Sequence, residues 1–168
     1  MENKKFEETL KEILPYVAII ILVILIKIFV VSPIRVNGNS MDNTLKDGDI
    51  MILNEISYKF NKVKRFDIVV IKVKNEYIIK RVIGLPGEKV KYRNNKLFIN
   101  NKYVKEEFNH AETEDFDEVI LKKGEYFVLG DNRVVSMDSR YFGPFTIKEI
   151  KGHTKLTLLP FKRFGIKK

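Results

Sequence analysis

The sequence contains no cysteine and only two histidines among its 168 residues. Without cysteine there is no disulfide framework, no thiolate nucleophile and no cysteine-based zinc site. His110 and His153 have no partner at a metal-binding spacing such as His-x-x-x-His, which favours surface positions over metal ligation. No internal repeat or low-complexity tract is present. We therefore expect no metal centre.

Acidic residues are the scarcer charged class, with 22 Asp and Glu against 31 Lys and Arg, for a net charge of +9. Residues 1–31 hold four of each sign, so the whole excess falls in the remainder of the chain. A basic domain of this kind suits nucleic acid or an anionic membrane surface. It is also compatible with a merely soluble basic surface, so charge alone leaves three interpretations open.

One long apolar run occupies residues 13–31, reads ILPYVAIIILVILIKIFVV and contains a single charge, Lys27. About 20 apolar residues span a bilayer as a helix. Pro15 lies near the start, where a helix tolerates proline, and Lys27 is close enough to the far end to reach the headgroups. A cleaved signal peptide would need a small-x-small site after the run, and none is present. A buried core helix would be shorter and polar on one side.

We therefore expect three parts in the chain. Residues 1–12 form a cytoplasmic tail, whose lysines are a mild inside signal, and residues 13–31 form a retained transmembrane anchor. Residues 32–168 form an extracytoplasmic domain, with a short hairpin insertion at about 89–124. The predicted location is the cell membrane, with a single pass.

The chain after Ser32-Pro33 is typical of a compact, mostly antiparallel β domain. Short runs rich in Ile, Val, Tyr and Phe alternate with Gly, Asn, Asp and Pro clusters. Residues 91–104 predict a hairpin or short meander, and the acidic stretch 108–118 predicts an exposed loop with one helical turn. The predicted strands are Ile50–Leu53, Asp67–Val73, Tyr77–Ile83, Leu97–Ile99 and Glu125–Leu129.

Two residues in this domain are candidates for catalysis. Ser40 lies in a glycine-containing turn, where its hydroxyl is exposed and backbone N–H groups can face an oxyanion, although most loop serines only form turns. Lys80 lies on an apolar strand, on the face of Ile78 and Val82. Desolvation there lowers the pKa of an ammonium and makes it a possible general base. The alternative places Lys80 on an edge strand, where lysine guards against aggregation.

A third segment, residues 130–144, is dense in polar residues directly after an apolar strand. Asp138 and Arg140 can form a charge-assisted pair, and Ser136 can offer a hydroxyl to a nearby amine. A polar loop with Asx-turns is the plainer interpretation. Together the three segments are compatible with a Ser/Lys dyad, a variant of the serine triad.

These segments also carry a resemblance to a known family. Five motifs, in the same order and spacing and preceded by an anchor, resemble the conserved boxes of type I signal peptidases, which are Ser/Lys serine proteases. The motifs are Val36–Leu45, Gly48-Asp49, Arg65–Val69, Lys80–Gly87 and Gly130–Gly143.

The resemblance implies an antiparallel β fold with an active site at the outer membrane surface. By position, Ser40 would be the nucleophile and Lys80 the base, without metal or cofactor. Val36 and Ile79 would line pockets for the small side chains of an Ala-x-Ala site. The implied partners are the lipid bilayer and the signal peptides of exported preproteins, or one dedicated substrate such as a pilin. The roles implied for the last motif are orientation of the lysine by Ser136 and support of that loop by Asp138 and Arg140.

Three positions depart from the family pattern. Asn43 replaces the usual proline, Gly38 replaces a serine that gives a second oxyanion donor in one branch, and Glu88 replaces an aspartate. The oxyanion contact that remains implied is the Ser40 N–H.

Three other functions compete with this interpretation. A self-cleaving repressor-type peptidase shares the dyad but is soluble. A membrane-anchored pseudoprotease or assembly factor is favoured only by Asn43. Nucleic-acid binding would use Tyr92, Phe98 and Tyr103 within a basic face, but a domain outside the cell meets lipid first.

Overall fold

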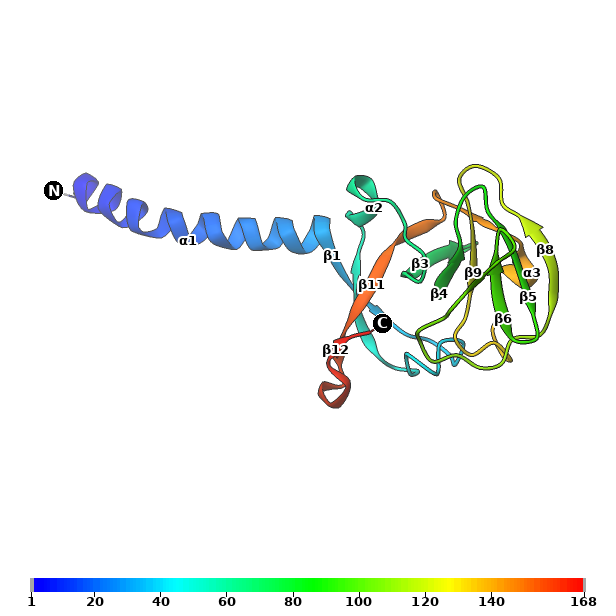
Figure 1. Cartoon of the computed structure of the whole chain (residues 1–168). Coiled ribbons are helices and arrows are strands. Elements are labelled where there is room, and N and C mark those ends of the chain that lie inside the picture. Colours follow the sequence, from blue (N-terminus) through cyan, green and yellow to red (C-terminus); the bar gives the residue numbers. More distant parts are fainter. Residues whose placement is uncertain (1, 168) are drawn as a thin grey trace.

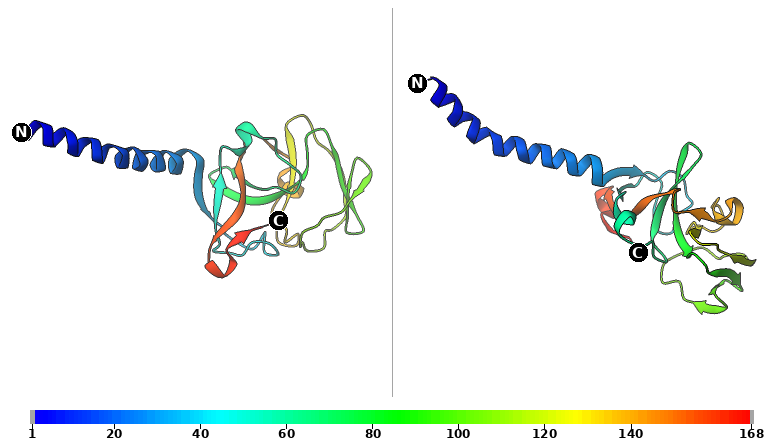
Figure 2. Two further views of the ribbon diagram at one scale, coloured as in Figure 1. Left: turned by 60° about the vertical axis from the view of Figure 1, so that its left-hand side comes forward. Right: turned by 90° about the horizontal axis from the view of Figure 1, so that it is seen from above.

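The computed structural model describes the backbone of residues 2–167. The side chains of residues 1–8, 10, 25–31, 59, 60 and 168 lie outside the described part. A long helix, α1 (Glu2–Val30), extends away from a β domain, and it does so in all three ribbon views (Figures 1 and 2). The chain therefore consists of one helical arm and one β domain.

Helix α1 covers the predicted tail and all but the last residue of the predicted anchor, of which residues 25–31 belong to the undescribed side chains. The apolar side chains described between Ile13 and Ile24 are exposed. Within the described residues, no helix meets the length and hydropathy needed to cross a membrane. The helix ends three residues before Pro33, which lies in strand β1 (Val31–Arg35) at the edge of a sheet, where proline is tolerated.

The larger sheet has eight strands and carries the site. Its order is β1-β2-β11-β3-β4-β9-β10, with β12 paired to β11, and every pairing is antiparallel. Its strands after β1 are β2 (Ile50–Asn54), β3 (Ile68–Val73), β4 (Glu76–Gly84), β9 (Glu125–Leu129), β10 (Phe145–Thr146), β11 (Ile150–Leu159) and β12 (Gly165–Ile166).

A second sheet of four antiparallel strands lies on the side of the domain away from α1 (Figure 1). Its order is β7-β6-β5-β8, and tight turns at Asn94-Asn95 and Asn100-Asn101, all at positive φ, connect its meander. Its strands are β5 (Lys89–Arg93), β6 (Lys96–Ile99), β7 (Lys102–Val104) and β8 (Phe116–Ile120). The short helices of the domain are α2 (Ser57–Phe60), α3 (Ser139–Phe142) and the 3-10 helix η1 (Phe161–Arg163).

Three clusters of buried hydrophobic side chains form the core. One lies beneath the Ser40 turn and includes Val36, Met41 and Ile79. A second joins the two sheets, with Tyr92 and Phe127 fully buried in it. The third packs against the other face of the large sheet, around Val69 and Val82. The Ser40 turn is therefore anchored on the core through its neighbour Met41.

The predicted β-rich, antiparallel character of the domain is confirmed, and all five predicted strands are present with ends shifted by at most one residue. The stretch 108–118 was predicted wrongly in part, because its end enters strand β8 instead of forming a helical turn. The insertion at about 89–124 is larger than the predicted hairpin, since it forms a four-stranded sheet.

Candidate active site

Ser40 and Lys80, forty residues apart, are brought into direct contact. The turn that carries Ser40 follows β1, and Lys80 lies in the middle of β4. The Lys80 Nζ and the Ser40 Oγ are 2.7 Å apart and share a hydrogen bond. Strand β4 lies between β3 and β9, so the alternative of an edge-strand lysine is wrong.

The Lys80 side chain is only 3% exposed, so its ammonium form is poorly solvated. Burial lowers its pKa from 10.5 to about 8, against the opposing effects of the nearby carboxylates Asp138 and Asp131. The lowered pKa of Lys80, which we predicted from its apolar strand, is therefore present. A substantial share of Lys80 is neutral at slightly alkaline pH and can accept a proton from Ser40.

Ser136 lies close to the dyad, but its hydroxyl makes no hydrogen bond within the described part of the chain. Its Oγ is buried and has no partner within the described part of the chain, so the predicted bond to Lys80 is not formed. The close packing around Ser136 is possible because residue 130 is a glycine and has no Cβ. A Cβ at this glycine would lie 2.3 Å from the Ser136 Oγ and 2.4 Å from the Ser40 carbonyl oxygen. Ser136 and the Ser40 carbonyl oxygen therefore both approach the position that a Cβ at residue 130 would occupy.

Asp138 and Arg140 form the pair that the sequence predicted. The guanidinium donates to both Asp138 carboxylate oxygens, at 2.9 Å each, and the carboxylate also accepts the Gly130 N–H at 3.0 Å. Arg140 Nη2 in addition donates to the Arg133 carbonyl oxygen at 2.6 Å. Asp138 caps helix α3 by accepting the Arg140 N–H. The pair thus fixes both ends of the loop that carries Ser136.

A second buried ion pair, which sequence reasoning did not identify, ties the Ser40 turn to this loop. Arg81 binds Asp131 through two hydrogen bonds of 2.8 and 2.6 Å, with both side chains at most 1% exposed. Thr44 donates to the same carboxylate at 2.5 Å. Asn43 adds a weaker bond of 3.4 Å to the Asp131 carbonyl oxygen. The sequence feature that could have indicated this pair is the adjacent Lys80-Arg81 on an apolar strand.

Arg133 connects the small sheet to the 130–138 loop. The sequence reasoning did not predict this connection. Its Nε donates to the Gly130 carbonyl oxygen at 2.9 Å, and its Nη2 pairs with Glu106 at 2.7 Å. Its Nη1 donates to the hydroxyls of Tyr92 and Thr113 at 2.7 and 2.5 Å. Glu106 precedes a stretch assigned to an exposed loop, so no periodic pattern marked it as buried.

A groove of about 550 Å³ opens at the dyad, between the Ser40 turn and the first half of β4. Exposed hydrophobic side chains from β4, the 130–138 loop and α3 form its rim. They are Tyr77, Val135, Met137 and Phe142. Ile79 lines the groove, whereas Val36 is buried beside Ile79 in the core cluster and does not line it. The assignment of both to substrate pockets stays a prediction.

The backbone N–H of Ser40 is available as a donor. Within the described residues, no acceptor is bonded to the Ser40 N–H, whereas the Gly38 N–H donates to Asp47 at 2.8 Å. The Ser40 carbonyl oxygen accepts the Asn132 N–H at 3.0 Å, which orients the turn. The geometry thus offers the Ser40 amide as an oxyanion contact and leaves no donor from Gly38 for that purpose.

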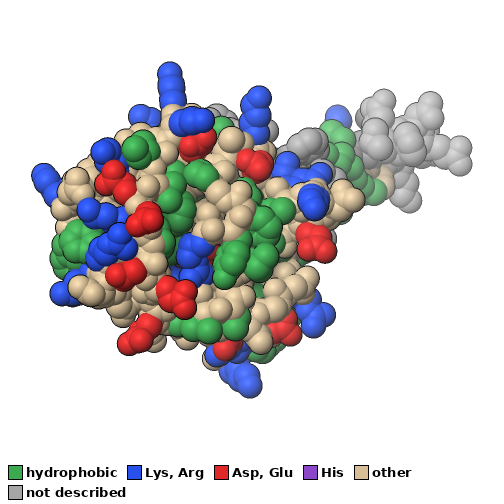
Figure 3. All heavy atoms as spheres, turned by 90° about the vertical axis from the view of Figure 1, so that its right-hand side faces the viewer, with side chains coloured by type: hydrophobic (Ala, Val, Ile, Leu, Met, Phe, Trp, Pro, Cys, Tyr) green, Lys and Arg blue, Asp and Glu red, His purple; other side chains and the backbone are tan. Residues whose placement is uncertain are grey.

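No group of three His, Asp or Glu side chains suited to a metal ion occurs in the described part of the chain. Figure 3 shows acidic and basic side chains interspersed across one face of the domain, around patches of hydrophobic side chains. This face lacks the continuous basic stripe that binds nucleic acid. The dyad and its groove are therefore the part of the molecule best equipped for chemistry.

Comparison with known proteins gives the same assignment as the geometry. A family model described as signal peptidase, peptidase S26, matches residues 8–159. A signal peptidase I of Bacillus caldolyticus is 39% identical over 90% of this chain and 92% of its own length. A signal peptidase I of Staphylococcus aureus, form IB, is 38% identical over 88% of this chain and 87% of its own.

A solved structure agrees as well. The crystal structure of a signal peptidase I from Enterococcus faecalis is similar with a TM-score of 0.50 and 35% identity, over 55% of this chain and 97% of that one. The chain belongs to the signal peptidase family, peptidase S26, and is a serine endopeptidase of the signal peptidase I kind.

Proposed function

We propose that this chain removes N-terminal signal peptides from exported preproteins with Ser40 as nucleophile and Lys80 as general base. The observation that carries the proposal is the 2.7 Å contact between the Lys80 Nζ and the Ser40 Oγ. Burial of Lys80 supports it, because the same desolvation that lowers its pKa to about 8 leaves a neutral amine available near physiological pH.

The reaction has two stages. Neutral Lys80 takes the Ser40 proton as the Oγ attacks the scissile carbonyl carbon, and the Ser40 N–H stabilises the resulting oxyanion. The C–N bond then breaks, the lysine returns its proton to the leaving amine, and an acyl-enzyme remains. In the second stage Lys80 takes a proton from water as the water oxygen attacks the ester carbonyl carbon. The bond between that carbon and the Ser40 Oγ then breaks, and Lys80 returns the proton to the Oγ.

The proposed substrate is an extended segment that ends in a small-x-small motif. Residues Glu76–Ile79 pair with β3 on one side, whereas β9 pairs only with later residues of β4, so the other edge beside the groove is open in the described fold. An incoming strand can add to such an edge through backbone hydrogen bonds. Ile79, backed by Val36, then limits the volume left for substrate side chains.

We propose that residues 13–31 anchor the enzyme in the membrane, with residues 1–12 in the cytoplasm and the catalytic domain outside. The apolar side chains described within this stretch are exposed in the isolated chain, which suits a lipid environment. Anchoring would hold the groove at the membrane surface, where the signal peptides of exported preproteins emerge.

The test uses purified protein in neutral detergent with a panel of preproteins, including a pilin-type precursor, and sequencing of the new N-termini. We expect cleavage after small-x-small sites that is abolished by Ser40→Ala. Lys80→Arg should be almost as damaging because a guanidinium cannot act as a base. The exposed Lys122→Ala is the matched control and should cleave normally.

Cleavage by the Ser40→Ala variant at the same sites would refute the mechanism. Cleavage of only one precursor would indicate a dedicated substrate. Labelling by a serine-reactive acylator, present in the unchanged protein and absent in Ser40→Ala, separates an active enzyme from a pseudoprotease.

A further inference from the structure

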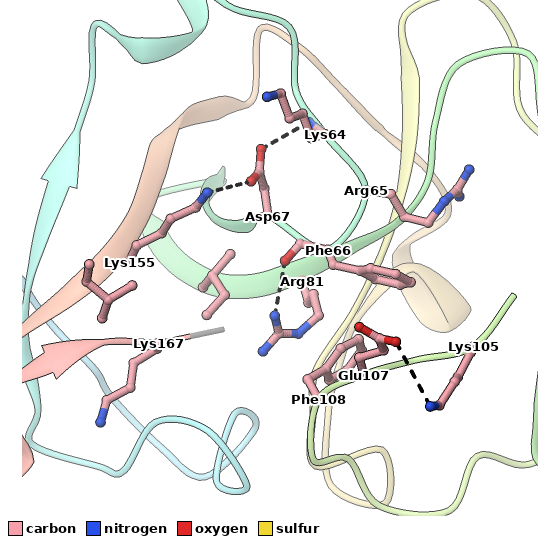
Figure 4. Close-up of a pocket in the computed structure, with 12 residues that line it drawn as sticks. Lys64, Arg65, Phe66, Asp67, Arg81, Lys105, Glu107, Phe108, Lys155 and Lys167 are labelled. Carbon is pink, nitrogen blue, oxygen red and sulfur yellow. Dashed lines mark hydrogen bonds and ion pairs between the residues drawn. The ribbon is translucent and has the colours of Figure 1, made fainter.

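A second cavity of about 550 Å³ lies away from the dyad and shares no lining residue with the substrate groove. Figure 4 shows the residues that line it, which come from the segment before β3 and the start of β3, from β4, β11, the end of the chain and the segment after β7. Its volume is within the range typical of small-molecule sites, about 300–1,000 Å³. The proposed peptidase reaction makes no use of this cavity.

Positive charge predominates in the lining. Six lining residues are cationic and two are acidic. Lys155 is paired with Asp67 at 3.2 Å, and Lys105 is 4.0 Å from Glu107. The cationic residues are Lys64, Arg65, Arg81, Lys105, Lys155 and Lys167. The lining therefore carries an excess of four positive charges.

Two of these cations have no counter-ion among the described residues. Arg65 and Arg81 are neutralised by carboxylates from outside the lining, Glu88 and Asp131. Lys64 and Lys167, in contrast, form no ion pair with any carboxylate of the described chain. Unpaired ammonium groups at the mouth of a cavity favour an anionic occupant.

The interior of the cavity combines one buried cation with an apolar wall. Arg81 is 1% exposed, and its guanidinium points into the cavity beside the ring of Phe108, with the two centres 4.0 Å apart (Figure 4). Phe66 packs against Phe108 with ring centroids 5.3 Å apart, and Ile68 and Ile166 complete the apolar wall. A ligand that fits both features carries an anionic group and an organic portion.

We propose that this cavity binds a phosphate ester, with the negative phosphate attracted by a cationic lining that includes Lys64 and Lys167, and with its organic portion against Phe66 and Phe108. Phosphate suits this set of donors because its oxygens accept several charge-assisted hydrogen bonds at once. The two sources of such a group are a phospholipid headgroup and a free organic phosphate. The same chemistry serves both, and experiment distinguishes them.

The ligand would also lie next to the catalytic support. Arg81 donates to the Phe66 carbonyl oxygen at 3.0 Å, to Thr44 at 3.2 Å and to Asp131, which links the cavity wall to the Ser40 turn. Binding there would restrain the turn through contacts that already exist.

The test is isothermal titration calorimetry on the full chain carrying Ser40→Ala, in neutral detergent, so that binding is measured without cleavage. The probes are glycerol 3-phosphate, short-chain phosphatidylglycerol and short-chain phosphatidylcholine. We expect saturable, salt-sensitive binding of phosphatidylglycerol that weakens at least tenfold in Lys64→Ala/Lys167→Ala, which corresponds to about 1.4 kcal/mol.

Lys122→Ala/Lys123→Ala removes two exposed lysines outside the cavity and is the matched control, expected to bind unchanged. Lys64→Arg/Lys167→Arg should retain binding because the charge is kept. Binding of glycerol 3-phosphate as well would identify free phosphates as a source, and binding of phosphatidylglycerol alone would identify lipid. Equal binding of phosphatidylcholine, equal loss in the control variant or no binding of either anionic probe would overturn the proposal, whatever the peptidase assay gives.

Discussion

Lys80 and Arg81 are neighbours on β4, yet one contacts Ser40 in the substrate groove and the other lines the basic cavity. Both side chains are buried, but their surroundings have opposite effects on their positive charges. Arg81 lies against Asp131 and keeps its charge through a two-bond ion pair. Within the described residues, the Lys80 Nζ hydrogen-bonds to a neutral hydroxyl alone, so burial acts against its charge. One strand thus carries a cation fixed by an ion pair and, next to it, an amine with a lowered pKa, which we propose to be the general base.

The first prediction concerns the pH dependence of catalysis. The pKa of Lys80 is lowered to about 8, and the base must be neutral to accept the Ser40 proton. We therefore expect kcat/KM to rise about tenfold per pH unit below pH 8 and to level off above it. Steady-state assays on a signal-peptide substrate from pH 6 to 10 measure this. A profile that is flat between pH 6 and 8 would contradict the role of Lys80 as base.

The second prediction concerns stability in Lys80→Met. The folded-state pKa, about 8, is below the unfolded value of 10.5, so the unfolded chain binds the extra proton between these pH values. Burial of this group therefore reduces stability most at pH 8 and below, by about 3 kcal/mol at most. We expect Lys80→Met to be inactive but more stable than the unchanged protein at pH 7, with the gain shrinking as pH approaches 10.5. Denaturant unfolding at both pH values is the measurement, and a gain that does not change with pH would contradict the explanation.

The sequence could predict those parts of the site that depend on residues close to one another in the chain. Ser40, Lys80 and the Asp138–Arg140 pair were identified because each lies in a local pattern: a glycine turn, an apolar strand and a short polar loop. The lowered pKa of Lys80 also follows from its immediate neighbours. Likewise, the five strands that were predicted alternate or run apolar over a short window.

The features that the sequence did not reveal depend on distant partners. Strand β11 has buried positions at Gly152, Thr154 and Thr157, so no alternation of apolar and polar residues marks it as a strand in the sequence. Glu106 is buried by Arg133 from a loop 27 residues later, and no local pattern indicates this. The absence of a Ser136–Lys80 bond likewise depends on packing around Gly130, which only the assembled fold determines.

The third prediction concerns Ser136. Its hydroxyl is buried without a partner in the described structure, so Ser136→Ala removes no hydrogen bond present in this state. We expect the free energy of unfolding to change by less than about 1 kcal/mol. If the hydroxyl engages Lys80 during the reaction, kcat should fall by roughly 10- to 100-fold with KM nearly unchanged. Activity equal to that of the unchanged protein would show that Ser136 has no positioning role.

The fourth prediction concerns Gly130. A Cβ there would lie within 2.4 Å of the Ser40 carbonyl oxygen, which is backbone and cannot rotate away. Gly130→Ala should therefore displace the Ser40 turn, reduce kcat by about 100-fold or more and destabilise the domain by roughly 1–3 kcal/mol. The matched control is Gly124→Asn, because Gly124 has a positive φ that asparagine tolerates and open space around it. The measurements are kcat and denaturant unfolding curves for both variants. Equal losses of kcat and stability in the two variants would show that the close contact at Gly130 is unimportant.

The last prediction concerns the link between the two sheets. Glu106 neutralises Arg133, which is fully buried and holds the Gly130 carbonyl oxygen. Glu106→Ala leaves that guanidinium buried without a counter-ion, which costs about 3–5 kcal/mol and lowers Tm by about 10 °C. Because Arg133 also orients the 130–138 loop, the variant should lose activity even at temperatures well below its unfolding temperature. Glu107→Ala is the control, since its exposed pair with Lys105 spans 4.0 Å and contributes at most about 1 kcal/mol. Matching Tm values for the two variants, measured by calorimetry, would mean that the buried pair does not couple the small sheet to the active site.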